Sequence, residues 1–280
     1  MISNDLGEAS VTPNEPLVAG SLSTIRFTYK AGHPIDDSGY LKIVFRSVSD
    51  FGAPQFDRPG EPNYCTVQTT GDCRLIARWD LKGHIRPWSR ALFIRITGGY
   101  LDRGEQIVLI FGERSGGCPG WLIQTFRARS FEFKTLVDPI ASYQFKELPV
   151  SPSVPIIAGS PVKAVCLAPS QAQIGDSFSY FLKIEDRWGN PTEPPRRHEH
   201  HGFESPGIHF VTAHNKETGL SAESNPIEVT DSPKELNRYW ADLHGQSEER
   251  LVQVQSKTTS SLPGNTHAWI SVRTRATTFR

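Results

Sequence analysis

The chain has 280 residues, in which 30 Lys and Arg balance 30 Asp and Glu, so the formal net charge at pH 7 is zero. A chain of this length is expected to form about two domains. Neither charge sign forms a long run, so the sequence lacks the basic surface that binds nucleic acid or an anionic membrane. No apolar stretch approaches the roughly 20 residues of a membrane span, and the first residues lack the features of a signal peptide. We therefore expect a cytoplasmic protein with no nucleic-acid or membrane partner.

Short alternating segments dominate the first half of the chain. Segment 23–30 places Ile25, Phe27 and Tyr29 on one face and polar residues on the other, which is the pattern of a half-buried strand. The 21 prolines and 23 glycines bound such segments and leave little room for helices. Short strands at this spacing predict a β-sandwich of immunoglobulin-like type over 1–146. The further strands expected in it are 40–45, 75–79, 91–97, 106–111, 121–126 and 130–137.

A second domain is expected after a change of composition. Segment 147–161 is rich in Pro, Ser and Ala, which predicts a semi-rigid linker or an edge segment. A second small β-sandwich is predicted over 162–235. Its expected strands are 162–167, 176–185, 208–214 and 226–230. Within it, Asp-Arg-Trp-Gly-Asn-Pro at 186–191 has the composition of a turn.

The four cysteines are Cys65, Cys73, Cys118 and Cys166. They form no C-x-x-C pair and lie at no zinc-finger spacing to a histidine, so a zinc site built from them is not expected. Cys65 and Cys73 flank Thr-Thr-Gly-Asp, a predicted hairpin turn, so they could face each other across two strands and be bridged in an oxidising compartment. In the cytoplasm, free thiols are favoured.

Two loops are rich in residues that can bind ions. The glycines of 112–120 can serve a tight strand connection or bring backbone amides near an anion, but the Lys-Ser/Thr ending of a phosphate loop is missing. The second loop contains His198, His200 and His201. On an extended chain His198 and His200 point the same way, while the later His209 and His214 fall on opposite faces. We expect a solvated loop, with adventitious divalent-metal binding as the alternative.

A motif near the end of the chain carries the sharpest chemistry. Segment 239–247 reads Tyr-Trp-Ala-Asp-Leu-His-Gly-Gln-Ser and resembles the opening motif of the domain-of-unknown-function 3604 family, related to the PHP-type metal-dependent hydrolases. Phrases at 186–191 and 224–227 also look like this family, so the resemblance covers roughly 162–246. It implies that 236–249 begins an α/β metal-hydrolase-like domain, and that Asp242, His244 and Gln246 stand at metal-ligand positions.

The ligand set differs from the family pattern at one position. Gln246 replaces the second histidine of the motif, and its amide oxygen is a weaker ligand than imidazole. The alternative for this segment is a plain strand end with a solvent-facing His244.

The last segment, 250–280, changes character. It is rich in Thr and Ser and contains no acidic residue. In a shifted reading frame the codons of 274–280 permit His-Gln-Gly-Asn-Asp-Phe-Gln, which resembles the next metal-site motif of the family, and 257–264 permit an apolar helix. The prediction is a frameshifted, disordered tail, and the alternative is a native Ser/Thr-rich tail.

These observations lead to two functional hypotheses. The resemblance implies a metal-dependent hydrolase, such as a phosphoesterase, in which zinc or manganese lowers the pKa of a bound water. This chain would be its non-catalytic N-terminal part, with no catalytic residue, because a catalytic ion normally needs three protein ligands. The alternative is a β-sandwich binding module for a glycan or protein partner. Its candidate stacking residues are Trp79, Trp88, Trp121 and Trp188, which would then be exposed in one plane rather than buried in cores.

Overall fold

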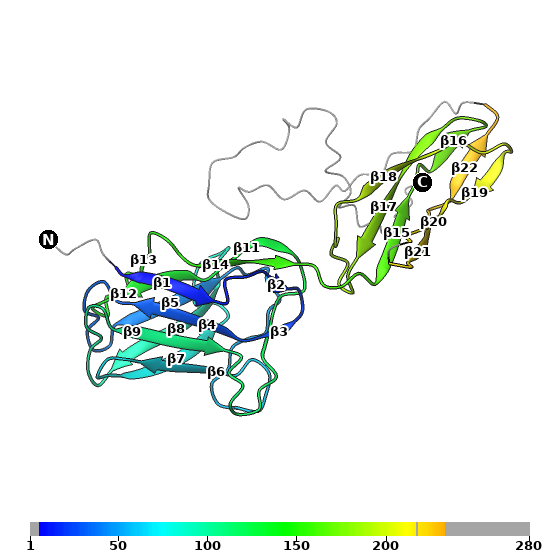
Figure 1. The fold of residues 1–280 in the computed structure, drawn as a ribbon. Helices are drawn as coiled ribbons and strands as arrows, with labels where there is room; N and C mark the ends of the chain where they lie inside the picture. The colour runs from blue at the N-terminus through cyan, green and yellow to red at the C-terminus, as the bar shows by residue number, and fades with distance from the viewer. Residues whose placement is uncertain (1–5, 217, 233–280) are drawn as a thin grey trace. The chain divides into compact units, whose positions relative to one another are not determined.

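The computed structural model describes residues 6–216 and 218–232, and every regular element in these ranges is a β-strand (Figure 1). The mainly β class predicted from the sequence is therefore confirmed. No helix in these ranges could cross a bilayer. The α/β segment predicted at 236–249 and the tail predicted at 250–280 lie outside the described residues.

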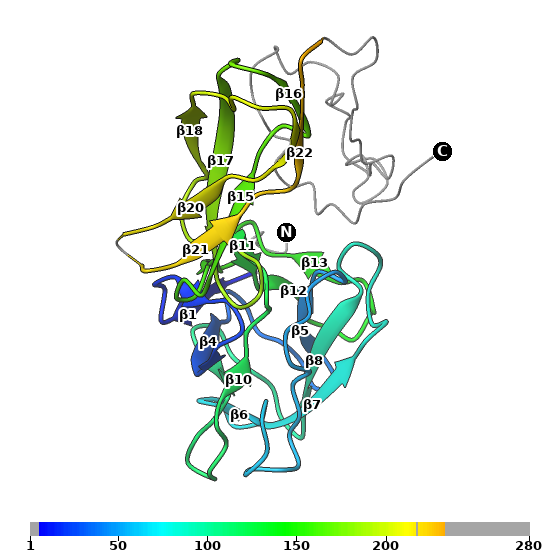
Figure 2. The same cartoon turned by 90° about the vertical axis from the view of Figure 1, so that its right-hand side faces the viewer.

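The first sandwich is built from two antiparallel sheets. The four-stranded sheet has the order β1 (Glu8–Thr12), β4 (Ile25–Lys30), β9 (Gln106–Phe111) and β6 (Cys65–Thr69). The five-stranded sheet has the order β13 (Lys146–Glu147), β12 (Lys134–Asp138), β5 (Tyr40–Phe45), β8 (Arg90–Thr97) and β7 (Arg74–Asp80). A rotated view separates the layer of β1 and β4 from that of β5, β8 and β7 (Figure 2).

One hydrophobic core lies between these two sheets. Its centre is aromatic, because the fully buried Phe45 has ring contacts to Trp79, Phe111, Trp121 and Phe133 at 5.4 to 6.2 Å. Trp121 stacks on Phe111 with ring centroids 4.5 Å apart. Such large buried rings contribute much of the apolar area that stabilises a domain.

Two smaller ladders complete the first sandwich. One joins β3 (Leu22–Ser23) to β10 (Trp121–Leu122). The other has the order β11 (Ala128–Glu132), β14 (Ser153–Ile157) and β2 (Leu17–Val18), with β14 parallel to β2.

Strand β14 corrects the expectation of a linker over 147–161. Val154 and Ile156 belong to the first core and are 0% and 2% exposed. Pro155 is tolerated inside the strand because the register between β11 and β14 shifts between Ala128 and Phe131, so the missing N–H falls at an irregular part of the ladder.

The hairpin predicted between Cys65 and Cys73 is also wrong. Strand β6 pairs with β9 in the four-stranded sheet, whereas β7 pairs with β8 in the five-stranded sheet. The segment between them therefore crosses from one sheet to the other. All four cysteines are free thiols, and burial raises the pKa of Cys65 to about 12.

The second sandwich has its own core, formed by eight buried residues between Ala164 and Val229. One sheet has the order β15 (Lys163–Leu167), β17 (Phe178–Glu185) and β18 (Arg196–His200). Another has the order β16 (Gln171–Gln173), β22 (Ile227–Thr230) and β19 (Gly207–His209), and a third pairs β20 (Thr212–His214) with β21 (Ser221–Glu223). The strand predicted at 208–214 is thus divided between two sheets.

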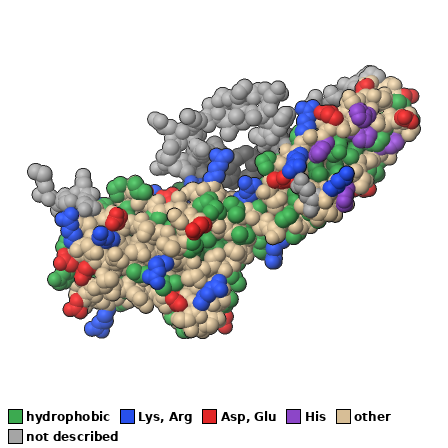
Figure 3. Space-filling model, viewed as in Figure 1, with side chains coloured by type: hydrophobic (Ala, Val, Ile, Leu, Met, Phe, Trp, Pro, Cys, Tyr) green, Lys and Arg blue, Asp and Glu red, His purple; other side chains and the backbone are tan. Residues whose placement is uncertain are grey.

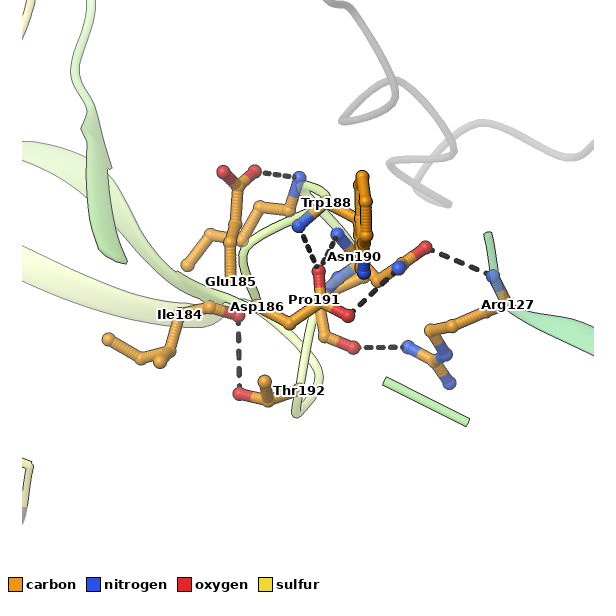
Figure 4. Close-up of polar contacts among 9 residues, drawn as sticks. Arg127, Ile184, Glu185, Asp186, Trp188, Asn190, Pro191 and Thr192 are labelled. Carbon is orange, nitrogen blue, oxygen red and sulfur yellow. Dashed lines mark hydrogen bonds and ion pairs between the residues drawn. The ribbon is translucent and has the colours of Figure 1, made fainter. Parts of the chain in front are cut away.

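The turn predicted at 186–191 is confirmed and is held by one buried carboxylate (Figure 4). Asp186 accepts hydrogen bonds at Oδ1 from the backbone N–H groups of Trp188 and Asn190, both at 2.9 Å. At Oδ2 it accepts from the backbone N–H of Gly159 and from Asn190 Nδ2. The carboxylate therefore fixes both the turn and the chain that enters the second sandwich.

The same turn bonds to the segment that follows β10. Asn190 Nδ2 donates to the carbonyl oxygen of Thr125 at 2.8 Å, and the backbone N–H of Arg127 donates to Asn190 Oδ1 at 3.0 Å. The Arg127 guanidinium donates to the carbonyl oxygen of Pro191 at 2.6 Å. Residues 125–127 thus hold the turn, and Phe126 among them also lines a pocket of the first sandwich.

Candidate binding pocket

A pocket of about 250 Å³ lies in the first sandwich beside β11. Four separate parts of the chain line it: the segment after β5, the loop before β8, the segment after β10, and β11 itself. The lining residues are Arg46, Val48, Ser49, Trp88, Gln124, Phe126, Ala128, Ser130, Phe131 and Glu132. The site is therefore assembled by the tertiary fold, since no two of these segments are adjacent in sequence except the last pair.

Buried hydrogen bonds hold one wall of the pocket. Ser49 and Gln124 are each 2% exposed, and Ser49 Oγ donates to Gln124 Oε1 at 2.6 Å. Gln124 Nε2 donates in turn to the carbonyl oxygen of Phe126 at 2.9 Å. Because these polar groups already have partners, they shape the pocket and are not its free binding groups.

The Trp88 indole forms a second wall. The backbone around Trp88 is held by hydrogen bonds. The backbone N–H of Trp88 donates to the carbonyl oxygen of Ile85 at 2.9 Å, and Ser47 donates to the carbonyl oxygen of Pro87 through both its backbone N–H and its hydroxyl. The Arg46 guanidinium lies 5.3 Å and the Lys134 ammonium 5.2 Å from the indole ring centroid. Cation–π attraction at these distances orients both the ring and the Arg46 side chain.

Glu132 is the unusual charge of the site. Burial raises the pKa of its carboxyl group, although the neighbouring Lys134 acts in the opposite direction. Lys134 itself is paired with Glu147 at 2.5 Å. Across the described ranges, neither Glu132 nor Arg46 forms an ion pair, so one carboxylate and one guanidinium in this pocket are available to a ligand.

Apolar side chains accompany these groups. Val48 is 62% and Phe126 37% exposed, whereas Phe131 is buried at 7%. The pocket thus has an apolar rim that is open to solvent and an apolar floor that belongs to the core. Few convergent polar groups among apolar walls, together with a carboxyl group of perturbed pKa, are the usual signature of a ligand site.

The metal-ligand positions predicted from the sequence motif, Asp242, His244 and Gln246, lie outside the described residues. Within 6–216 and 218–232, no group of three or more His, Cys, Asp or Glu side chains is placed to hold a metal ion. The ligand set expected from the family resemblance stays a prediction about the last part of the chain.

The four tryptophans do not form a common platform. Trp121 is fully buried, and Trp79 packs against Phe45 in the first core with ring centroids 6.0 Å apart. Trp188 belongs to the turn at 186–191 and is 36% exposed. Trp88 alone among the four lines the pocket.

The histidine-rich segment is a strand, not the solvated loop expected from the sequence. His198 and His200 lie in β18 opposite Tyr180 and Phe178 of β17 and stack on those rings with centroids 5.2 and 4.9 Å apart. Phe203 continues the stack to His200, and histidine side chains gather on this sandwich (Figure 3). The imidazole rings of His198 and His200 therefore pack against aromatic rings of the neighbouring strand, which explains why histidine occupies alternate positions of β18.

The Gly-rich segment 112–120 connects strands. Arg114 fixes it by donating from Nε to Thr24 Oγ1 and from Nη2 to the carbonyl oxygen of Leu22, both at 3.1 Å. Gly112 has φ of +69°, and a Cβ atom there would lie 2.3 Å from the backbone nitrogen of Trp121. A close approach of two backbones therefore requires this glycine, which favours the strand-connection reading over an anion site.

Sequence reasoning singled out Trp88 but missed Arg46 and Glu132. The sequence signal for Glu132 is weak. A charged residue between Phe131 and Phe133 is also what a strand with one solvent-exposed face ordinarily shows. Arg46 follows β5 and carries no sequence mark at all.

Comparisons with known proteins complete this description. No protein-family model matches the chain, and no curated protein matches it. Among solved structures, one match is an inactive mutant of the GH20 exo-β-N-acetylglucosaminidase from Vibrio harveyi, with 14% sequence identity and a TM-score of 0.25. The match covers 62% of this chain and 24% of that chain, so this chain spans about a quarter of that protein, and a likeness at this level carries no conclusion about activity.

Proposed function

We propose that the first sandwich is a glycan-binding module and that the pocket beside β11 is its binding site. The observation that carries this proposal is the pair of unpaired charged side chains, Glu132 and Arg46, in a pocket with the Trp88 wall and the exposed Phe126 rim. A sugar ring presents both kinds of surface that this pocket offers, namely hydroxyl groups at its edge and C–H groups on its faces.

The polar groups are arranged for hydroxyl groups in both directions. The Glu132 carboxylate accepts hydrogen bonds, and the Arg46 guanidinium donates them. Glu132 is partly buried, whereas Arg46 is exposed. A partly buried carboxylate without a partner is costly, so a ligand that supplies hydroxyl groups to Glu132 recovers interactions that the free protein leaves unmade. Charge-assisted hydrogen bonds are roughly twice as strong as neutral ones.

The first test is direct binding. Titrating the protein with methyl glycosides of glucose, galactose, mannose and N-acetylglucosamine should give saturable binding for at least one, measured by calorimetry and by tryptophan fluorescence. Arg46→Met and Trp88→Leu should each weaken that binding at least tenfold, which corresponds to about 1.4 kcal/mol. Both changes keep much of the side-chain volume, so the fold should survive.

Trp188→Phe is the matched control, because Trp188 lies outside the pocket lining. It should bind the same glycoside with unchanged affinity. Binding that survives both pocket substitutions, or an amino acid such as leucine that binds where every sugar fails, would reject the glycan proposal.

A metal-dependent hydrolase is the second candidate, and the motif at 239–247 supports it. In that proposal Asp242, His244 and Gln246 would contribute to a zinc or manganese site of the longer family architecture, and the two sandwiches would be its non-catalytic N-terminal part. The two proposals are compatible, since a binding module can precede a catalytic domain.

A further inference from the structure

We infer that the pocket recognises a single, uncharged, terminal sugar ring and not the side of a long glycan chain. The inference rests on the proposed function and adds to it the class of ligand. Two observations support it: the size of the pocket together with the positions of the tryptophans, and the balance of charges around Glu132.

The first observation is that the site has room for one ring. A volume of about 250 Å³ falls just below the range of roughly 300 to 1,000 Å³ that is common for small-molecule pockets. Binding along a glycan chain needs several aromatic rings exposed side by side. Among the residues 6–216 and 218–232, Trp121 and Trp79 are core residues and Trp188 belongs to the second sandwich, so Phe126 is the one exposed ring that accompanies Trp88 in the pocket lining.

The second observation is that charge is balanced at the pocket. The Arg46 guanidinium and the Lys134 ammonium lie 5.3 and 5.2 Å from the Trp88 ring centroid. Burial raises the pKa of the Glu132 carboxyl group and both cations act in the opposite direction, and Lys134 is already paired with Glu147. A carboxylate on the sugar would be attracted by Arg46 and repelled by Glu132, and an ammonium group would meet the reverse, so neither charge gains a net attraction that offsets the loss of its hydration. Like charges at close range repel by amounts that matter in a partly desolvated site, so an uncharged ring with hydroxyl groups fits best.

A length series tests the first half of the inference. The methyl glycoside that binds best should be compared with the disaccharide and tetrasaccharide of the same sugar, using calorimetry at pH 7. Dissociation constants within about threefold of one another are expected, because only one ring enters the pocket. An affinity that rises tenfold or more from one ring to four would overturn the inference and leave the glycan-binding module standing.

A charge series tests the second half. The uronic acid and the amino sugar that correspond to the best neutral ring should each bind at least tenfold more weakly at pH 7. Glu132→Gln keeps the shape of the side chain and removes its charge, so the penalty against the uronic acid should shrink at least fivefold in this variant. Equal binding of neutral and acidic rings by the wild-type protein would contradict the inference.

Thermal unfolding curves that match the wild type would show that Glu132→Gln is folded. Ser130→Ala is the control for the charge effect, because it changes the pocket lining without changing its charge. Failure of every sugar, charged or neutral, to bind would remove the proposed function and this inference with it. Chain-length dependence or charge indifference would remove this inference alone.

Discussion

Asp186 is a buried carboxylate whose ionised form is stabilised by its hydrogen bonds. It is 2% exposed, and burial by itself raises the pKa of such a group. The bonds from Asn190, Gly159 and Trp188 outweigh that effect and hold the pKa of Asp186 below its usual value. The charged form is therefore the one that the fold selects.

Replacing Asp186 with alanine should lower the free energy of unfolding by about 3 kcal/mol, because three backbone N–H groups and the Asn190 amide lose their acceptor. Urea denaturation at pH 7 measures the change. The exposed Asp176→Ala is the control and should change stability by less than about 0.5 kcal/mol.

The pH dependence of the same variant gives a second readout. Since the folded pKa of Asp186 lies below the unfolded value of 3.8, its stabilisation is complete above pH 3.8 and is lost as the pH falls through the folded pKa. The gap between wild type and Asp186→Ala should therefore narrow below pH 3.8. A gap that stays constant there would contradict the role assigned to the ionised carboxylate.

Lys42 is a second buried charge, on the outer face of the five-stranded sheet. It is 4% exposed, and burial lowers its pKa. Its ammonium group lies 4.7 Å from the Phe93 ring centroid, 4.4 Å from that of Phe145, and 3.3 Å from His84 Nδ1. Two aromatic faces and one imidazole replace part of the hydration that the ammonium group has lost. These contacts give Lys42 a structural role.

At the scale of single elements, β14 shows that a proline-rich segment can be a core strand. It lies between β11 and β2 and contributes Val154 and Ile156 to the first core. Strand β11 also lines the pocket, so β14 is hydrogen-bonded to one of the strands that form the pocket wall. The proline-rich sequence predicts an exposed connection. Pairing with β11 and β2 instead makes this segment the central strand of a three-stranded sheet.

Ile156→Ala should therefore destabilise the protein by about 2 to 4 kcal/mol, the usual cost of removing a large aliphatic side chain from a core. Chemical denaturation measures this. Val150 lies in the same predicted linker but is 77% exposed, so Val150→Ala should have almost no effect. Equal, small effects at both positions would show that the segment is a linker after all.

Strand β18 illustrates how an edge can be protected by its own side chains. Arg197 and Glu199 form an ion pair at 3.0 Å, and Arg197 also donates to Ser179 on β17. His198 and His200 cover the other face by stacking on β17 rings. Charged residues along an edge strand discourage pairing with other chains, so the histidine-rich composition has a structural explanation.

At the scale of the whole molecule, the described residues form two β-sandwich cores, and the predicted metal motif follows them in sequence. The first core ends with Ile156 and the second begins with Ala164. The glycan proposal belongs to the first sandwich, whereas the hydrolase proposal depends on Asp242, His244 and Gln246. The frameshift proposed for 250–280 stays a prediction about the gene, which its nucleotide sequence would decide.

The hydrolase proposal predicts little metal affinity for this chain alone. Asp242 and His244 give one carboxylate and one imidazole, and Gln246 adds a weak amide oxygen, which is fewer strong ligands than a catalytic ion requires. The full chain should bind zinc or manganese no more tightly than its His244→Ala variant, measured by calorimetry and by metal analysis after dialysis. Stoichiometric metal that survives dialysis and disappears in the variant would reveal a stronger site.

The class of fold could be predicted from the sequence, because period-2 alternation shows which side of a strand is buried. Segments 40–45 and 106–111 are strands with the predicted bounds, and the turn at 186–191 follows from the hydrogen-bonding habits of Asp, Gly and Asn. These are local properties, and local chemistry decides them. The sequence also favoured free thiols over a Cys65–Cys73 bridge, and all four cysteines are free, whereas it left open whether Trp121 lies in the core.

Strand pairing and the contacts between distant side chains depend on long-range packing, and the sequence did not predict them. Strands β6 and β7 follow each other in sequence but join different sheets, because β6 pairs with β9 and β7 pairs with β8. Arg46, Trp88 and Gln124 come from segments far apart in the sequence, and Glu132 lies on the strand that follows Gln124; nothing in this spacing indicates that the four share a pocket. A pocket of this kind arises from long-range packing, so the sequence predicted the strands that line it but not the pocket itself.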